Sequence, residues 1–156
     1  MRISLFDQWG AKNSAPVWAA FARGAQALGH TVQRHDTSAD LAVIWSLVWA
    51  GRMRANQAIY NQFRNSGRNV LILEVGTLRR GVTWKMAING LNNGAVWGQG
   101  LDPLRPHTLG LQLQPWHQAG EDIVVLVQRH DSEQWPRSIS TDQWLSQVCE
   151  SLRCHT

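Results

Sequence analysis

"LAVIWSLVWAGRMRANQAIYNQFRNSGRNVLILEVG", residues 41–76, decides the fold, because it has the pattern of a strand, a helix and a second strand. Residues 41–49 are apolar on both faces, which is typical of a central parallel strand covered by helices. Residues 52–66 repeat apolar side chains on one helical face, and Gly67 ends that helix. Residues 69–75 form the second apolar run, so the stretch predicts one strand–helix–strand unit.

A similar pattern precedes this stretch. Residues 2–7, "RISLFD", predict a short strand that ends in an acid, and Pro16 marks the start of a helix over residues 16–28. Residues 31–36, "TVQRHD", predict a weaker strand. The resulting order, β-α-β-β-α-β, predicts an α/β fold: a Rossmann-like, doubly wound, mostly parallel sheet with helices on both faces.

The pattern loosens in the second half of the chain. Residues 77–108 contain many Gly and Asn residues and predict loops with one short helix near Trp84. The alternating run "TLGLQLQ", residues 108–114, and the apolar run "DIVVLVQRH", residues 122–130, predict two further strands.

The last helix is the clearest element near the C-terminus. Ser140 and Gln143 have the spacing of a capping box, which predicts the start of a helix. Leu145, Val148 and Leu152 then lie on one face of it. We therefore expect an amphipathic helix here.

The composition points to a class of partner. The chain has 156 residues, a net charge of +4 and nine tryptophans, and only two of its 15 basic residues are lysines. Arginine offers a planar fork that suits phosphates, and tryptophan stacks on rings. Together they indicate a polyanionic, ring-containing partner such as nucleic acid or a nucleotide. The alternative is a basic protein whose tryptophans only pack its core.

The sequence gives little support for a membrane protein, an exported protein or a metal-binding protein. The longest apolar run, residues 41–50, is too short to span a bilayer, so we expect no membrane. Asp7 lies where a signal peptide would still be apolar, so we expect no export. Cys149 and Cys154 have no second pair and no metal-ligand spacing, so we expect free thiols and no metal.

Two acids emerge directly from buried strands, and both are candidate general bases. Asp7 follows the first strand and Glu74 lies near the end of the strand over residues 69–75. Partial burial raises the pKa of a carboxyl group and suits it to taking a proton from a hydroxyl. Alternatively, each acid caps a neighbouring amide, or Glu74 pairs with Arg79 or Arg80.

Cationic side chains follow the same strands. We expect five of them to hold phosphates: Arg52, Arg54, Arg79, Arg80 and Lys85. A run of charges is also typical of a solvated surface, and that alternative stays open. No phosphate-binding P-loop and no dinucleotide fingerprint is present.

The segments "ILEVG" and "TWKMAINGLN", within residues 72–92, carry a family resemblance. With the residues before them they resemble the N-terminal half of glycosyltransferases carried by DNA-modifying bacteriophages, over roughly residues 1–135. Such proteins are similar to two-domain transferases of the GT-B type, whose N-terminal domain receives the acceptor. The resemblance implies that residues 1–115 form this Rossmann-like domain. Residues 116–156 would then be a linker, a strand and a helix that begin the second domain, in a fragment or in a reduced protein.

This resemblance implies transfer of a sugar from a nucleotide sugar, most simply a UDP-sugar, to a hydroxyl acceptor. The acceptor would be a hydroxymethylated base in phage DNA, and the protein would act in the cytoplasm of an infected bacterial host. We expect no tightly bound cofactor. A non-catalytic nucleic-acid or nucleotide-binding module with the same fold is the alternative, and a small-molecule enzyme unrelated to DNA is the third.

In this hypothesis Asp7 or Glu74 deprotonates the acceptor hydroxyl. The residues expected to bind the acceptor lie near strand ends or in the segment after residue 76: Trp9, Trp45, Gly76, Trp84, Asn89 and His130. Each has a plainer alternative, because a tryptophan can pack the core, a glycine can serve a turn and a strand-end histidine is often structural.

Overall fold

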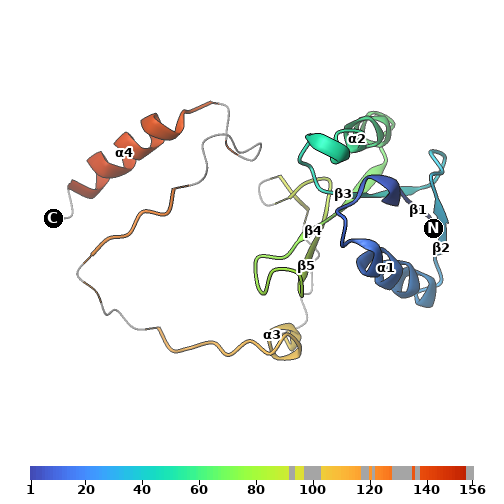
Figure 1. The fold of residues 1–156 in the computed structure, drawn as a ribbon, viewed down its shortest axis with the longest axis horizontal. Helices are drawn as coiled ribbons and strands as arrows, with labels where there is room; N and C mark the ends of the chain where they lie inside the picture. Colours follow the sequence, from blue (N-terminus) through green and yellow to red (C-terminus); the bar gives the residue numbers. More distant parts are fainter. Residues whose placement is uncertain are drawn as a thin grey trace. The chain divides into compact units, whose positions relative to one another are not determined.

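A computed structural model of the chain describes residues 1–91, 94–96, 103–116, 120, 122–127, 135 and 138–153 (Figure 1). The chain divides into two units, residues 1–101 and residues 102–156, and each is described by itself. None of the described helices is long and apolar enough to cross a membrane.

The first unit is built on one five-stranded sheet with the order β2-β1-β3-β4-β5. Strands β1 to β4 pair in parallel and β5 pairs antiparallel to β4, so the predicted α/β fold with a mostly parallel sheet is confirmed. The strands have these bounds: β1 Arg2–Leu5, β2 Thr31–Arg34, β3 Leu41–Trp45, β4 Asn69–Val75 and β5 Trp84–Ile88.

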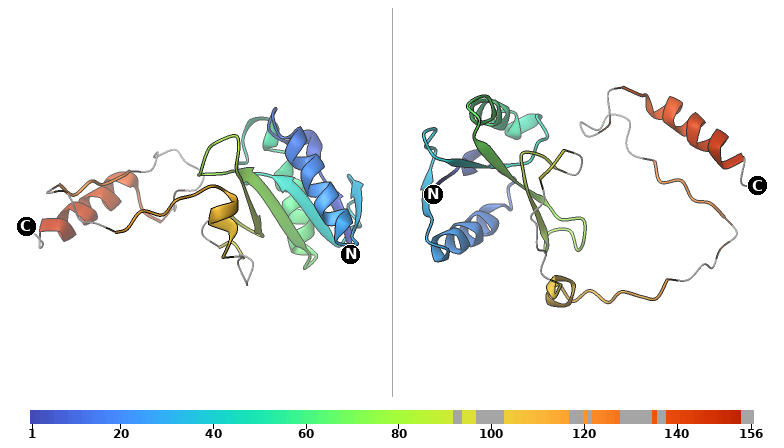
Figure 2. Two further views of the ribbon diagram at one scale, coloured as in Figure 1. Left: turned by 90° about the horizontal axis from the view of Figure 1, so that it is seen from below. Right: turned by 180° about the vertical axis from the view of Figure 1, so that it is seen from behind.

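Two helices cover opposite faces of this sheet, as predicted (Figure 2). Helix α1, Ala15–Ala27, packs Trp18 against Trp45 of β3, while helix α2, Asn56–Asn65, packs Phe63 against Ile44. Successive side chains of a strand point to opposite faces, so a strand that is apolar throughout serves both cores. Trp45 is 1% exposed and Phe63 is fully buried. Short 3₁₀ helices follow β1 and β3: η1 Asp7–Trp9 and η2 Gly51–Met53.

The crossover, residues 35–40, joins β2 to β3 without a helix. His35 donates a backbone hydrogen bond to Leu5 at the end of β1 (3.2 Å), and Asp40 donates one to Arg2 at its start (2.9 Å). The chain therefore runs back along the whole of β1, although parallel strands are usually joined through a helix.

The segment around Trp84 was predicted as a short helix, and this prediction is wrong. It forms β5, which pairs with β4 in a register that sets Val75 opposite Trp84 and Leu71 opposite Ile88. The segment is too short to show a helical period, and hydrogen bonding to the exposed edge of β4 stabilises it as a strand.

The second unit contains α3, Arg105–Thr108, and α4, Thr141–Arg153. The predicted capping box of α4 is confirmed, because Gln143 donates its backbone N–H to the Ser140 hydroxyl (3.1 Å) and its side chain accepts from the Ser140 N–H (3.0 Å). Trp135 packs edge-on against Trp144 of α4, with ring centres 5.7 Å apart.

The two strands predicted for this half are not formed in its described part. Residues 111–116 and 122–127 have no regular secondary structure, and Thr108 belongs to α3. An apolar or alternating run becomes a strand only when a neighbouring strand accepts and donates its hydrogen bonds, and none is paired with these described residues. Residues 128–130 lie outside the described residues, and the expected domain boundary near residue 115 stays a prediction.

Candidate functional site

The most distinctive place in the first unit is the edge of the sheet where β1, β2 and β3 end. Strands β1 and β3 are neighbours, yet the helices that follow them cover opposite faces. In open α/β sheets such a switch point leaves a crevice outside the carboxyl ends of the strands, and ligands usually bind there.

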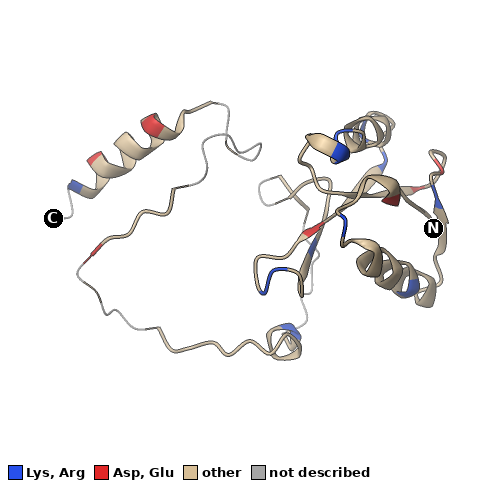
Figure 3. Cartoon of the chain, in the orientation of Figure 1, with Lys and Arg blue, Asp and Glu red and all other residues tan. Residues whose placement is uncertain are grey.

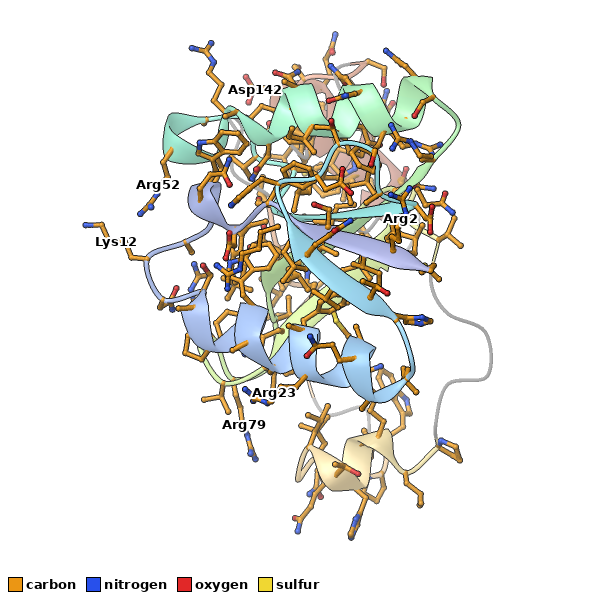
Figure 4. All side chains as sticks on the ribbon, turned by 90° about the vertical axis from the view of Figure 1, so that its right-hand side faces the viewer. Arg2, Lys12, Arg23, Arg52, Arg79 and Asp142 are labelled. Carbon is orange, nitrogen blue, oxygen red and sulfur yellow. The ribbon has the colours of Figure 1, made fainter. Side chains whose placement is uncertain are left out.

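A pocket of about 410 Å³ lies at this edge, on the side of α1. Its lining comes from the end of β1, the turn into α1, the end of β2 and the segment after β3: Asp7, Gly10, Ala11, Lys12, Ser14, Ala15, Trp18, Ala19, Arg34 and Arg52. Figure 4 shows the labelled side chains of Lys12 and Arg52 extending toward the same side. The volume is within the range of small-molecule sites.

Local packing fixes the turn that carries the pocket. The Ser14 hydroxyl donates to the carbonyl of Ala11 (2.6 Å) and accepts from Nε1 of Trp18 (3.0 Å). Gly10 is buried against the same two side chains, and a Cβ there would collide with the Ser14 hydroxyl. The absence of a Cβ at Gly10 therefore allows the backbone to approach Ser14 and Trp18 closely.

The pocket lining carries more positive than negative charge. The Asp7 carboxylate, which is 15% exposed, pairs through Oδ2 with Arg34 (2.6 Å) and lies 3.4 Å from Nε2 of His35 through Oδ1. Lys12 and Arg52 form no ion pair within the described residues. Three cations against one carboxylate leave two positive charges on the lining, an arrangement that favours an anion.

The structure does not bring the two predicted bases together. Asp7 lines the pocket on the side of α1. Glu74 alternates along β4 with Leu73 and Val75, which pack toward α1, so its side chain lies on the opposite face. Glu74 accepts from the N–H of Val75 (2.7 Å) and faces Lys85 in the register of β5. An acid–base pair made of both carboxylates does not form.

Of the three tryptophans predicted to bind an acceptor, Trp45 and Trp84 pack against each other. Trp45 lies between Trp18 and Trp84, with ring centres 6.0 and 5.6 Å away, and its burial leaves no face for a ligand. Trp84 is half-buried against Trp45, and Trp9 is half-buried at the end of η1. Neither Trp84 nor Trp9 lines the pocket.

Gly76 and Asn89 have structural partners. The Gly76 N–H donates to the carbonyl of Thr83 (2.9 Å), and a Cβ at Gly76 would overlap Thr83, so the predicted close backbone approach is made by this chain itself. Asn89 accepts from the backbone of Val70 at the start of β4 (2.9 Å) and donates to the side chain of Asn69 (2.9 Å). It therefore lies at the opposite end of β4 from the switch point. His130 lies outside the described residues.

Among the five predicted phosphate-binding cations, Arg52 alone lines the pocket. Arg54 is exposed two residues later, Arg79 and Arg80 are exposed in the β4–β5 turn, and Lys85 is in β5. Figure 3 shows basic residues on both helices and on the β4–β5 hairpin of this unit, rather than gathered in one place. In the ranges that the structure describes, no group of three or more metal-ligating side chains comes together.

Apart from glycine and alanines, sequence reasoning missed four lining residues: Lys12, Ser14, Trp18 and Arg34. A signal was available for the first two, since a glycine, a lysine and a serine occupy alternate positions between the first strand and the helix predicted to start at Pro16. Arg34 is the last residue of a weakly patterned strand, and only the sheet order places it beside Asp7.

A scan with protein-family models matched no family, and searches of curated proteins and of solved structures found no match. The chain is therefore characterised by its own geometry, as an α/β domain with a five-stranded, mostly parallel sheet and a basic pocket at the β1–β3 switch point.

Proposed function

We propose that this chain binds a nucleotide, and that the pocket at the β1–β3 switch point holds its phosphate. The observation that carries the proposal is the convergence of Lys12, Arg34 and Arg52, from three separate segments, on one pocket. Ion pairing and hydrogen bonding from such groups to a phosphate are stronger than between neutral partners.

Lys12 and Arg52 have the clearest role in this proposal. Since neither has an acidic partner among the described residues, a phosphate would neutralise them without breaking an existing ion pair. Arg34 is already engaged by Asp7 and would contribute as part of that pair. In open α/β sheets ligands bind outside the carboxyl ends of the strands, so the rest of the nucleotide would lie there.

Sugar transfer is the second function that we propose, with a UDP-sugar as donor and a hydroxyl of a modified DNA base as acceptor. It rests on the resemblance to phage GT-B transferases and on one observation, the presence of Asp7 in the pocket. Asp7 would take the proton of the acceptor hydroxyl, whose oxygen bonds to the anomeric carbon of the sugar as the bond from that carbon to the nucleoside diphosphate breaks. Glu74, on the other face of the sheet, has no part in this version of the reaction.

The proposed binding is tested by calorimetric titration of the chain with UDP and UDP-glucose. Arg52→Ala and Lys12→Ala should each weaken binding by about tenfold or more, because a hydrogen bond to a charged group contributes about 1.5–3 kcal/mol. Arg54→Ala is the matched control. It removes the same charge two residues from Arg52, but the Arg54 side chain does not line the pocket.

Equal losses in Arg52→Ala and Arg54→Ala would contradict the proposal, because a general charge effect would then explain binding. Mass spectrometry of hydroxymethylated DNA, incubated with the chain and UDP-glucose, tests the transfer reaction separately. Transfer that survives Asp7→Asn unchanged would remove Asp7 from the reaction.

A further inference from the structure

We propose that Asp7 selects the ligand of this pocket: it favours a phosphate ester that carries about two negative charges and a hydroxyl group over more highly charged phosphates. This inference rests on the proposed function and deepens it. It starts from a feature that a simple anion site does not need, a carboxylate held among three cations.

The carboxylate is held in place. Its Oδ2 lies 2.6 Å from Nη1 of Arg34, at the end of the neighbouring strand β2, and only 15% of the side chain is exposed. Asp7 also begins η1, whose backbone turns immediately after β1. The short backbone turn and the pairing with Arg34 keep this carboxylate at the pocket when a ligand enters.

The fixed carboxylate limits how much negative charge the pocket accepts. With Asp7 present, the lining carries two positive charges, which match a phosphate monoester of about two negative charges at neutral pH. The diphosphate bridge of a nucleotide sugar carries a similar charge. A triphosphate brings additional negative charge near Asp7, and like charges that face each other in a binding site are costly.

The second oxygen of the Asp7 carboxylate, Oδ1, accounts for the preference for a ligand with a hydroxyl group. Oδ1 lies 3.4 Å from Nε2 of His35, a distance too long for a strong hydrogen bond, and in this proposal the ligand hydroxyl donates to Oδ1. Inorganic phosphate has no ribose or sugar hydroxyl to offer there, whereas a nucleotide or a sugar phosphate does. A nucleotide and a sugar phosphate both carry a phosphate ester and a hydroxyl group, and the experiment below distinguishes between them.

The experiment is a calorimetric comparison, at constant ionic strength and neutral pH, of UMP, UTP, ribose 5-phosphate, UDP-glucose and inorganic phosphate. In Asp7→Asn the affinity for UTP should rise relative to that for UMP by about tenfold. The advantage of ribose 5-phosphate over inorganic phosphate should shrink in the same variant. Tighter binding of UMP than of ribose 5-phosphate would identify a nucleotide, and equal binding a sugar phosphate.

Asp36→Asn is the matched control, because Asp36 is also an acid near the end of β2 but does not line the pocket. Its relative affinities should stay those of the wild type. Arg34→Gln is a second variant, for which we expect the opposite change in selectivity. It removes one cation and leaves Asp7, so the affinity for UTP should fall relative to that for UMP. Circular dichroism would confirm that each variant is folded.

The outcomes separate this inference from the proposed function. If the wild type binds none of the five ligands, both are wrong. If the wild type binds them and Asp7→Asn changes all affinities by one common factor, the pocket binds phosphate but Asp7 does not select its ligand.

Discussion

The guanidinium of Arg68 lies 4.1 Å from the ring centre of Phe63, and the same side chain donates hydrogen bonds to the carbonyls of Thr37 (2.7 Å) and Ala39 (2.8 Å). Arg68 follows the end of α2, whereas the two carbonyls belong to the crossover, residues 35–40. One cation thus fastens the crossover to the end of the helix that covers the same face of the sheet.

Replacing Arg68 with alanine should therefore lower the free energy of unfolding by about 1–3 kcal/mol, because two backbone carbonyls lose a charged donor and a cation leaves the Phe63 ring. Urea unfolding monitored by circular dichroism measures this loss. Arg23→Ala removes an exposed arginine of α1 and should stay within about 0.5 kcal/mol of the wild type. Indistinguishable effects of the two substitutions would show that the crossover does not depend on Arg68.

Two glycines should respond to alanine in opposite directions. Gly76→Ala should destabilise the chain by about 1–3 kcal/mol, since the new Cβ overlaps the backbone and side chain of Thr83. Gly24→Ala, in the interior of α1 with open space around the position, should stabilise it by about 0.5–1 kcal/mol. Thermal unfolding measures both. If Gly76→Ala left stability unchanged and altered only ligand binding, Gly76 would be a ligand-contact residue after all.

Binding to duplex DNA makes a prediction about salt. If Arg79 and Arg80 both contact phosphates, their double replacement by alanine should weaken binding to all sequences alike and reduce the slope of log affinity against log salt by about two. Fluorescence anisotropy at several salt concentrations measures that slope. The double variant Arg23→Ala, Arg64→Ala removes the same charge from exposed positions of α1 and α2 and serves as control. A slope that both variants change equally would exclude a local contact by the hairpin.

The ionisation of Asp36 should make the stability of the chain depend on pH. Hydrogen bonds from the side chain and the backbone of Ser38, with the charge of Arg2, lower the pKa of Asp36 below its ordinary value of 3.8. The stabilisation by a carboxylate with a lowered pKa is fully present above the unfolded-state pKa and is lost as the pH falls through the folded-state pKa. The stability difference between wild type and Asp36→Asn should therefore be largest at neutral pH and shrink in acid. Urea unfolding at a series of pH values measures it, and a difference that grew in acid would contradict the assignment.

The sheet could be predicted as far as local pattern determines it. Residues 41–49 and 69–75 are apolar on both faces, a pattern typical of a covered parallel strand. The first of these strands is shorter than predicted, because β3 ends at Trp45. Trp84 to Ile88 could not be assigned in this way, because five residues of mixed character become a strand only through pairing with β4. The runs over residues 111–116 and 122–127 show the converse, since an apolar pattern without a paired neighbour in the described structure stays irregular.

The site could be predicted only for residues near the carboxyl end of a strand. Asp7 and Arg52 come two and seven residues after β1 and β3, and both line the pocket. Glu74 lies near the end of β4, but the alternation of side chains along β4 turns it to the other face. Arg34 reaches the pocket because β2 lies beside β1, a fact of sheet order that no local pattern contains.

The helix-free crossover also has a consequence for synthesis on the ribosome. Because residues 35–40 lead straight from β2 to β3, the three strands β2, β1 and β3 are complete once Trp45 has emerged. Helix α1 is already present by then to cover one face, but Phe63 and Arg68 have not been made. The nascent chain thus passes through an interval in which Ala42 and Ile44 present an apolar surface to solvent, and such surfaces are where growing chains aggregate or recruit chaperones. The interval closes when α2 is added, some twenty residues later.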